Sequence, residues 1–201
     1  MSILKNKIIL FINRFSQYAI SGFYFWIFLI RGGIIYGFVP AAVGLIKCIH
    51  EIQHNDEQSL KTIYAESYKQ NKHHKGLSFT LFILLGLSIM SLCIPLFSKD
   101  PIIGFFQLPL IIFTCILWTI SIYYVYFLSE ANKKKGDMKW IAALSFVTCI
   151  KHPLKSLIIL ITMLVLCFLI KINLVIFIFF VPPIFILSTN KIVTIPSVLK
   201  H

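Results

Sequence analysis

Residues 101–129 are the feature that most constrains the fold of this chain. They read PIIGFFQLPLIIFTCILWTISIYYVYFLS, which is 29 residues without a charged side chain. A helix needs only about 20 apolar residues to cross the ~30 Å hydrocarbon core of a bilayer. Trp118 lies in this run, and Tyr123, Tyr124 and Tyr126 follow toward one end, where amphipathic rings favour the headgroup level. The run therefore predicts a membrane-crossing helix around which the other segments are arranged.

The composition predicts an integral membrane protein for the whole of residues 1–201. The mean hydropathy is +0.88, and charged residues make up 13% of the chain, against about 25% in soluble domains. We therefore expect an all-α, polytopic helical bundle that forms a single membrane domain. The net charge of +12 does not indicate a nucleic-acid partner, because the basic residues lie in short loops between apolar runs. There they act as topology signals, and the expected partner is the lipid bilayer with its anionic lipids.

The cysteines favour neither a disulfide framework nor a metal site. They are scattered without CxxC spacing, and at least three fall inside apolar runs, where cysteine behaves as a small hydrophobe. The five are Cys48, Cys93, Cys115, Cys149 and Cys167. We expect no cofactor.

The first third of the chain alternates between the membrane surface and the membrane. Residues 1–17 predict an interfacial amphipathic helix. Residues 18–46 predict the first span, and 29 residues would extend about 43 Å as a helix. That length favours one tilted or kinked helix, with the kink at the glycine pair 32–33 or at Pro40. Residues 50–75 predict a cytoplasmic amphipathic helix.

The remaining segments predict two helical hairpins separated by a basic connection. Residues 77–129 form the first hairpin, residues 130–155 a basic loop with an interfacial helix, and residues 156–190 the second hairpin. Pro182 and Pro183 are expected to break its last helix near the exit, and residues 191–201 form a polar tail. Together with the first span, this arrangement predicts about five transmembrane helices.

The distribution of basic residues predicts the orientation. The segments 47–75 and 133–155 together with the tail carry 13 of the 19 basic residues, which places them in the cytoplasm by the positive-inside rule. Five crossings would put the N-terminus outside, although its own lysines favour the inside. The alternative is that the first apolar region dips into the membrane and returns, which keeps the N-terminus cytoplasmic.

Arg31 is the candidate functional residue inside the membrane. It interrupts the first apolar region, and charged residues at membrane depth are functional candidates by default. No predicted span contains an acidic partner for it. Arg31 therefore either binds a lipid phosphate or another anionic ligand, or extends to the interface. The lack of intramembrane carboxylates also argues against a proton-driven pump, and the lack of a P-loop argues against nucleotide hydrolysis.

Residues 50–54 read HEIQH and fit the HExxH pattern. On a helix, His50 and His54 face one way and can hold zinc, with Glu51 as a general base. No recognisable downstream motif supplies a third acidic ligand, because Asp100 and Glu130 are isolated. A membrane zinc metalloprotease is therefore the less favoured alternative, and we expect neither a catalytic nor a metal site.

Several segments carry a family resemblance. The chain has FYFWI at 23–27, GG at 32–33, YGFVPAA at 36–42, YAESYKQN at 64–71 and KHPLKSL at 151–157. These resemble the YesL family of bacterial integral membrane proteins, whose members share an aromatic first span and a polar helix before the next span. Arg31 departs from the apolar residue typical of the family.

The resemblance implies a multi-pass protein of the bacterial cytoplasmic membrane without an established biochemical activity. Members of the family tend to be encoded beside carbohydrate-uptake and carbohydrate-degradation proteins. We therefore expect a non-enzymatic accessory component of carbohydrate uptake or utilisation, with subunits of an ABC-type carbohydrate transporter as partners. The alternative is a small transporter or a lipid-binding membrane protein.

Overall fold

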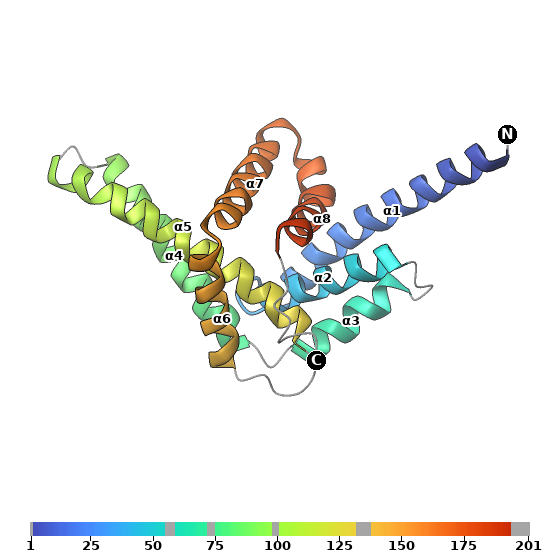
Figure 1. Cartoon of the computed structure of the whole chain (residues 1–201), viewed down its shortest axis with the longest axis horizontal. Coiled ribbons are helices and arrows are strands. Elements are labelled where there is room, and N and C mark those ends of the chain that lie inside the picture. The colour runs from blue at the N-terminus through green and yellow to red at the C-terminus, as the bar shows by residue number, and fades with distance from the viewer. Residues whose placement is uncertain (1, 55–58, 72–74, 98–100, 132–137, 194–201) are drawn as a thin grey trace.

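The computed structural model describes residues 2–54, 59–71, 75–97, 101–131 and 138–193. Every regular element in these residues is an α-helix, which confirms the all-α prediction (Figure 1). The helices are α1 (Ser2–Arg31), α2 (Phe38–His54), α3 (Leu60–Asn71), α4 (Lys75–Phe97), α5 (Pro101–Glu130), α6 (Met138–Lys151), α7 (Pro153–Ile172) and α8 (Leu174–Ile192). The centre of the basic loop and most of the tail lie outside the described residues.

Helix α2 is the centre of the molecule. It packs against α1, α3, α4, α5 and α8, so it touches more neighbours than any other described helix. Val39, Ala41, Val43 and Cys48 have no exposed surface, as expected for a helix that is covered on several sides. The polar residues of α2 gather in its last two turns. The apolar N-terminal end of α2 therefore lies in the core, and its polar C-terminal end lies toward the surface.

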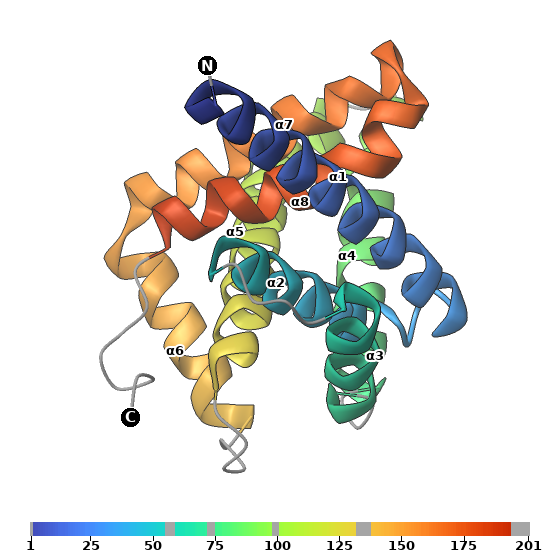
Figure 2. The same ribbon diagram turned by 90° about the vertical axis from the view of Figure 1, so that its right-hand side faces the viewer.

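The first apolar region differs from its prediction. One kinked helix was expected over residues 18–46, with a separate interfacial helix before it. Instead α1 continues without a break from Ser2 to Arg31, the chain turns back over residues 32–37, and α2 packs against α1. Figure 2 shows α1 and α2 as two distinct helices. Two packed helices bury more of their apolar surface than one long kinked helix could.

The end of α5 is buried among the neighbouring helices. Tyr123, Tyr124 and Tyr126 are at most 5% exposed, because α2, α4, α6 and α7 all pack against α5. Burial among helices does not test the depth of these rings in the membrane, so their place at the headgroup level stays a prediction. In contrast, the side chains of residues 111–113 are exposed. The uncharged run is a core element at one end and a bilayer-facing or partner-facing element at the other.

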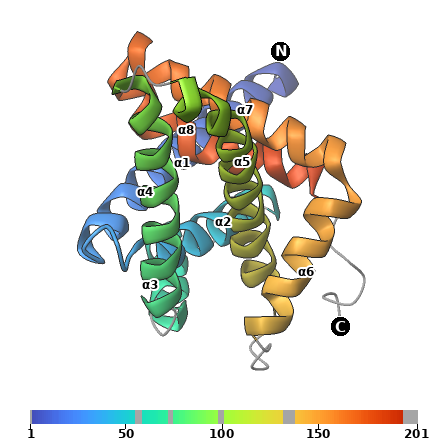
Figure 3. The ribbon, with the colours of Figure 1, turned by 90° about the vertical axis from the view of Figure 1, so that its left-hand side faces the viewer.

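Two pairs of helices form the predicted hairpins. Helices α4 and α5 pack together, as do α7 and α8. The first pair runs vertically in Figure 3, while the second crosses above it. Three helices of the described residues are long and apolar enough to cross a membrane, namely Gln107–Glu130, Pro153–Ile172 and Leu174–Ile192. The chain thus has the candidate spans of a multi-pass membrane protein, and the number five stays a prediction.

Pro182 and Pro183 do not end the last helix, contrary to expectation. Helix α8 continues through both residues to Ile192. Each proline lacks an N–H and removes one hydrogen bond to the carbonyl four residues earlier. The contact of α8 with α1 compensates for this loss.

Candidate functional site

The turn after Arg31 is a complete helix-ending motif. Gly33 has a φ of +73°, its N–H donates to the carbonyl of Ile30 at 2.8 Å, and the N–H of Ile34 donates to the carbonyl of Leu29 at 2.9 Å. These two bonds with a left-handed glycine form a Schellman motif. Arg31, the last residue of α1, is exposed beside it. The glycine pair in the sequence therefore reverses the chain instead of kinking a helix.

The same turn holds a strained residue and a close backbone approach. Ile34 has a φ of 56°, a left-handed conformation that is unfavourable for a β-branched side chain. A Cβ atom on Gly32 would lie 2.3 Å from the Cα of Gly37, so the two ends of the turn touch. Only glycine fits at Gly32, since the obstructing atom belongs to the backbone.

Helix α4 fixes the start of α2. The N–H of Val39 donates to the Oγ of Ser78 at 3.2 Å, and Ser78 has no exposed surface. This bond caps an N–H of the first turn of α2 with a side chain 39 residues away. The ring of Tyr36 stacks on Phe79 with a centroid distance of 5.8 Å. The turn is therefore held by α4 as well as by its own backbone.

Helix α3 contributes Tyr64 to the core under this turn. Tyr64 has no exposed surface, its hydroxyl donates to the carbonyl of Ala41, and its ring stacks on Phe28 with a centroid distance of 4.8 Å. A Cβ on Gly44 would lie 2.8 Å from the Tyr64 ring, so Gly44 supplies the flat surface for it. Burial raises the pKa of Tyr64 well above its usual value. Tyr64 is a neutral, structural residue.

Tyr68, one turn later on α3, is different. Its hydroxyl lies over Gly32, where a Cβ would come within 2.6 Å of it. Partial burial raises the pKa of Tyr68, and the nearby positive charge of Arg31 lowers it again. Among the described residues, the Tyr68 hydroxyl makes no hydrogen bond and Arg31 has no carboxylate partner. The sequence singled out Arg31 but not Tyr68, whose role depends on how α3 packs.

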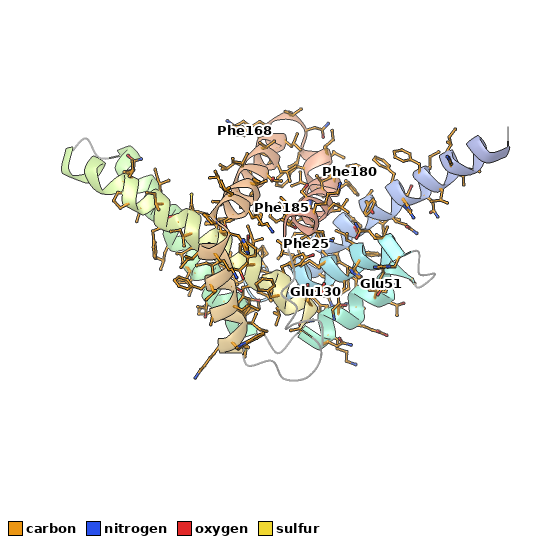
Figure 4. All side chains as sticks on the ribbon, in the orientation of Figure 1. Phe25, Glu51, Glu130, Phe168, Phe180 and Phe185 are labelled. Carbon is orange, nitrogen blue, oxygen red and sulfur yellow. The ribbon has the colours of Figure 1, made fainter. Side chains whose placement is uncertain are left out.

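The HExxH histidines lie on the last turns of α2. The rings of His50 and His54 are 4.6 Å apart between centroids, and both are exposed. The described residues contain no group of three histidine, cysteine or acidic side chains that could hold a metal ion. Figure 4 shows Glu51 on α2 and Glu130 at the end of α5, both far from Phe168 near the α7–α8 turn. The two imidazoles are thus neighbours without a third ligand in the described chain.

Helix α1 covers the carbonyls that the prolines of α8 leave unpaired. The indole Nε1–H of Trp26 donates to the carbonyl of Ile178 at 2.9 Å, which is the acceptor that Pro182 cannot reach. The carbonyl of Phe179, left by Pro183, lies against Gly22, where a Cβ would be 2.1 Å away. We call this contact the α1–α8 seam. It is flanked by the aromatic pairs Phe15–Phe180, Phe23–Phe179 and Trp26–Phe177.

Two hydroxyls of α5, those of Thr114 and Tyr124, are buried without a partner among the described residues. The hydroxyl of Tyr123 lies beside Ser156 of α7. Thr119, also on α5, donates to the carbonyl of Cys115 at 2.8 Å. A buried hydroxyl without a partner costs about 1–3 kcal/mol of desolvation. The sequence could not reveal these groups, because tyrosine at this position is equally typical of a membrane interface.

The comparisons with known proteins concern the first half of the chain. Residues 18–92 match the family model described as a protein of unknown function, DUF624. No curated protein and no solved structure matches the chain. The DUF624 segment begins near the middle of α1 and extends through the turn, α2 and α3 into α4. It therefore contains Arg31, Tyr68, both HExxH histidines and the α1 side of the α1–α8 seam, while α8 lies outside it.

Proposed function

We propose that this chain is a multi-pass protein of the bacterial cytoplasmic membrane that binds other membrane proteins and catalyses no reaction. The observation that carries the proposal is the first half of α1. This segment extends away from the other helices, at the right of Figure 1. Within it, the side chains of residues 8–12 are apolar but are not covered by the rest of the described chain.

The exposed segment, residues 8–12, is apolar on every side of the helix. All five side chains are at least 52% exposed, and Phe11 reaches 70%. Five consecutive residues point around the whole circumference, because each turns by about 100°. Asn13 and Arg14 follow directly, so the segment is too short to cross a bilayer alone. A helix of another membrane protein can pack against such a short apolar segment and bury it.

The arrangement of the two HExxH histidines does not favour the metalloprotease alternative. A zinc metalloprotease needs a third protein ligand beside the two histidines of HExxH. His50 and His54 have no such companion among the described residues. The exposed position of both rings also gives no enclosed space in which a peptide could be cleaved away from water.

The choice of partner rests on the resemblance to the YesL family. That resemblance suggests an accessory role in carbohydrate uptake, so the membrane subunits of an ABC-type carbohydrate transporter are the partners to examine first. Apolar surface exposed on α1 suits contact with such subunits within the membrane. The match to DUF624 is neutral on this point, since the family is of unknown function.

The test is affinity purification of the tagged chain from native membranes after mild chemical cross-linking. We expect a discrete partner to co-purify with the wild type and to be lost with the double substitution of Phe11→Ser and Ile12→Ser. Ile158→Ser, at a side chain that is 49% exposed on α7, is the matched control and should retain the partner. A chain that purifies alone, together with an unchanged growth phenotype on sugars after deletion, would refute the proposal.

A further inference from the structure

Two polar side chains meet at the turn between α1 and α2, and partner binding through residues 8–12 uses neither. Arg31 is exposed at the end of α1, and the hydroxyl of Tyr68 lies over the next residue, Gly32. Tyr64 on the same helix has its hydroxyl bonded to a backbone carbonyl, whereas that of Tyr68 has no partner in the described chain. Two hydrogen-bond donors are therefore available on one side of the turn.

The ionised side chains of α3 and of the end of α1 sum to a positive charge. Lys61 and Lys69 are exposed on α3, which also carries Glu66. Adding Arg31, the formal charge of this region is +2 from three cations and one anion. No carboxylate of the described chain pairs with Arg31 itself, so its charge remains available to a ligand. The complementary ligand is an anion.

The apolar residues around Arg31 indicate what kind of anion fits. Ile30 and Ile34 flank the turn and are 67% and 51% exposed. A soluble anion would have no contact with these side chains, whereas the acyl chains of a lipid would cover them. Helix α3 lies on the opposite side of the molecule from the α7–α8 turn (Figure 1). That side is the one that the basic residues assign to the cytoplasmic surface.

We propose that Arg31 and Tyr68 bind the phosphate of an anionic lipid headgroup. The guanidinium presents parallel N–H donors that match two phosphate oxygens, and the phenol hydroxyl donates a third hydrogen bond. Ile30 and Ile34 contact the start of the acyl chains. The strained turn holds Arg31 beside Tyr68, since Gly32 lets α3 approach the backbone there.

The experiment measures binding of short-chain phosphatidylglycerol and phosphatidylcholine to the purified full chain in a non-ionic detergent. We expect the wild type to prefer phosphatidylglycerol. Arg31→Gln should weaken this binding about 10-fold or more, because it removes a full charge and two hydrogen bonds, and Tyr68→Phe about threefold, because it removes one hydrogen bond of a neutral donor. Phosphatidylcholine should bind more weakly to all three proteins and depend less on Arg31, because its choline cation neutralises the phosphate. Lys171→Gln, an exposed cation at the α7–α8 turn, is the control and should change nothing.

Two further measurements distinguish lipid binding from a folding defect of the variants and from binding of a soluble phosphate. Arg31→Lys keeps the charge but loses the planar fork, so an affinity between those of the wild type and Arg31→Gln is expected at an unchanged melting temperature. If inorganic phosphate binds with the same dependence on Arg31 and displaces the lipid, the phosphate site is upheld with a soluble ligand. Wild-type affinity in Arg31→Gln, or an equal loss in Lys171→Gln, would overturn the proposal.

Discussion

Tyr64 and Tyr124 show how much the partner of a buried hydroxyl matters. Both rings lie in the core, but the hydroxyl of Tyr64 donates to a carbonyl and that of Tyr124 has no partner in the described chain. Removing a bonded hydroxyl costs about 1 kcal/mol, whereas removing an unpaired one relieves desolvation. We expect Tyr64→Phe to lower the free energy of unfolding and Tyr124→Phe to leave it unchanged or raise it. Unfolding in mixed micelles would show this, and equal losses would contradict it.

The bond between Trp26 and Ile178 can be isolated with a double-mutant cycle. Trp26→Phe should cost about 1–3 kcal/mol, because it leaves a carbonyl unpaired. Pro182→Ala restores an N–H that can bond the same carbonyl within α8. The cost of Trp26→Phe should therefore fall clearly when both changes are combined, as measured by the free energies of unfolding of the four proteins. Simple additivity would show that the indole N–H does not serve this carbonyl.

Most of these residue contacts could not be predicted from the sequence. Arg31 was found because a charge in an apolar run is conspicuous. Tyr68, Gly22 and Trp26 looked like ordinary members of helical patterns, and their importance comes from contacts with distant segments. Trp26 and Ile178 are 152 positions apart. No local pattern carries such information.

At the level of elements, the turn between α1 and α2 stores strain in Ile34. A non-glycine residue in the left-handed region costs about 1–2 kcal/mol. Ile34→Gly should therefore raise the thermal unfolding temperature, since the side chain is 51% exposed and contributes little packing. Ile35→Gly is the control at the neighbouring position and should lower it by loosening the backbone. A lowered unfolding temperature for Ile34→Gly and a raised one for Ile35→Gly would mean that Ile34 is not strained.

The elements were predictable where a long apolar run met a clear polar boundary. The hairpins α4–α5 and α7–α8 follow from such runs and from the short connections between them. The failure at residues 18–46 has a physical cause, because glycine, proline and mid-run charge are compatible both with a kink and with a reversal. The choice between them depended on Ser78 of α4, which caps the start of α2. The continuation of α8 through its two prolines similarly depends on α1, because Trp26 of α1 donates to a carbonyl that the prolines leave unpaired.

For the whole molecule, the reversal at residues 32–37 changes the expected position of the N-terminus. Helices α1 and α2 pack against each other around this reversal, and neither belongs to the three helices of the described residues that are long and apolar enough to cross a membrane. We expect a reporter that is active only in the cytoplasm to be active when fused at residue 1 and also at residue 201. This result corresponds to four crossings, by α4, α5, α7 and α8. An inactive reporter at residue 1 together with an active one at residue 201 would favour five crossings instead.

The α1–α8 seam ties the order of synthesis to the completion of the fold. A ribosome produces Ile178 152 residues after Trp26, so the indole N–H has no acceptor on α8 while the residues between them are made. Until then, two backbone carbonyls of α8 would lie in hydrocarbon without a hydrogen-bond donor, which costs several kcal/mol of free energy for each. We therefore expect α8 to pack on α1 only after all the helices between them have been made. Truncated products that end before α8 should stay open and be the preferred targets of membrane proteases.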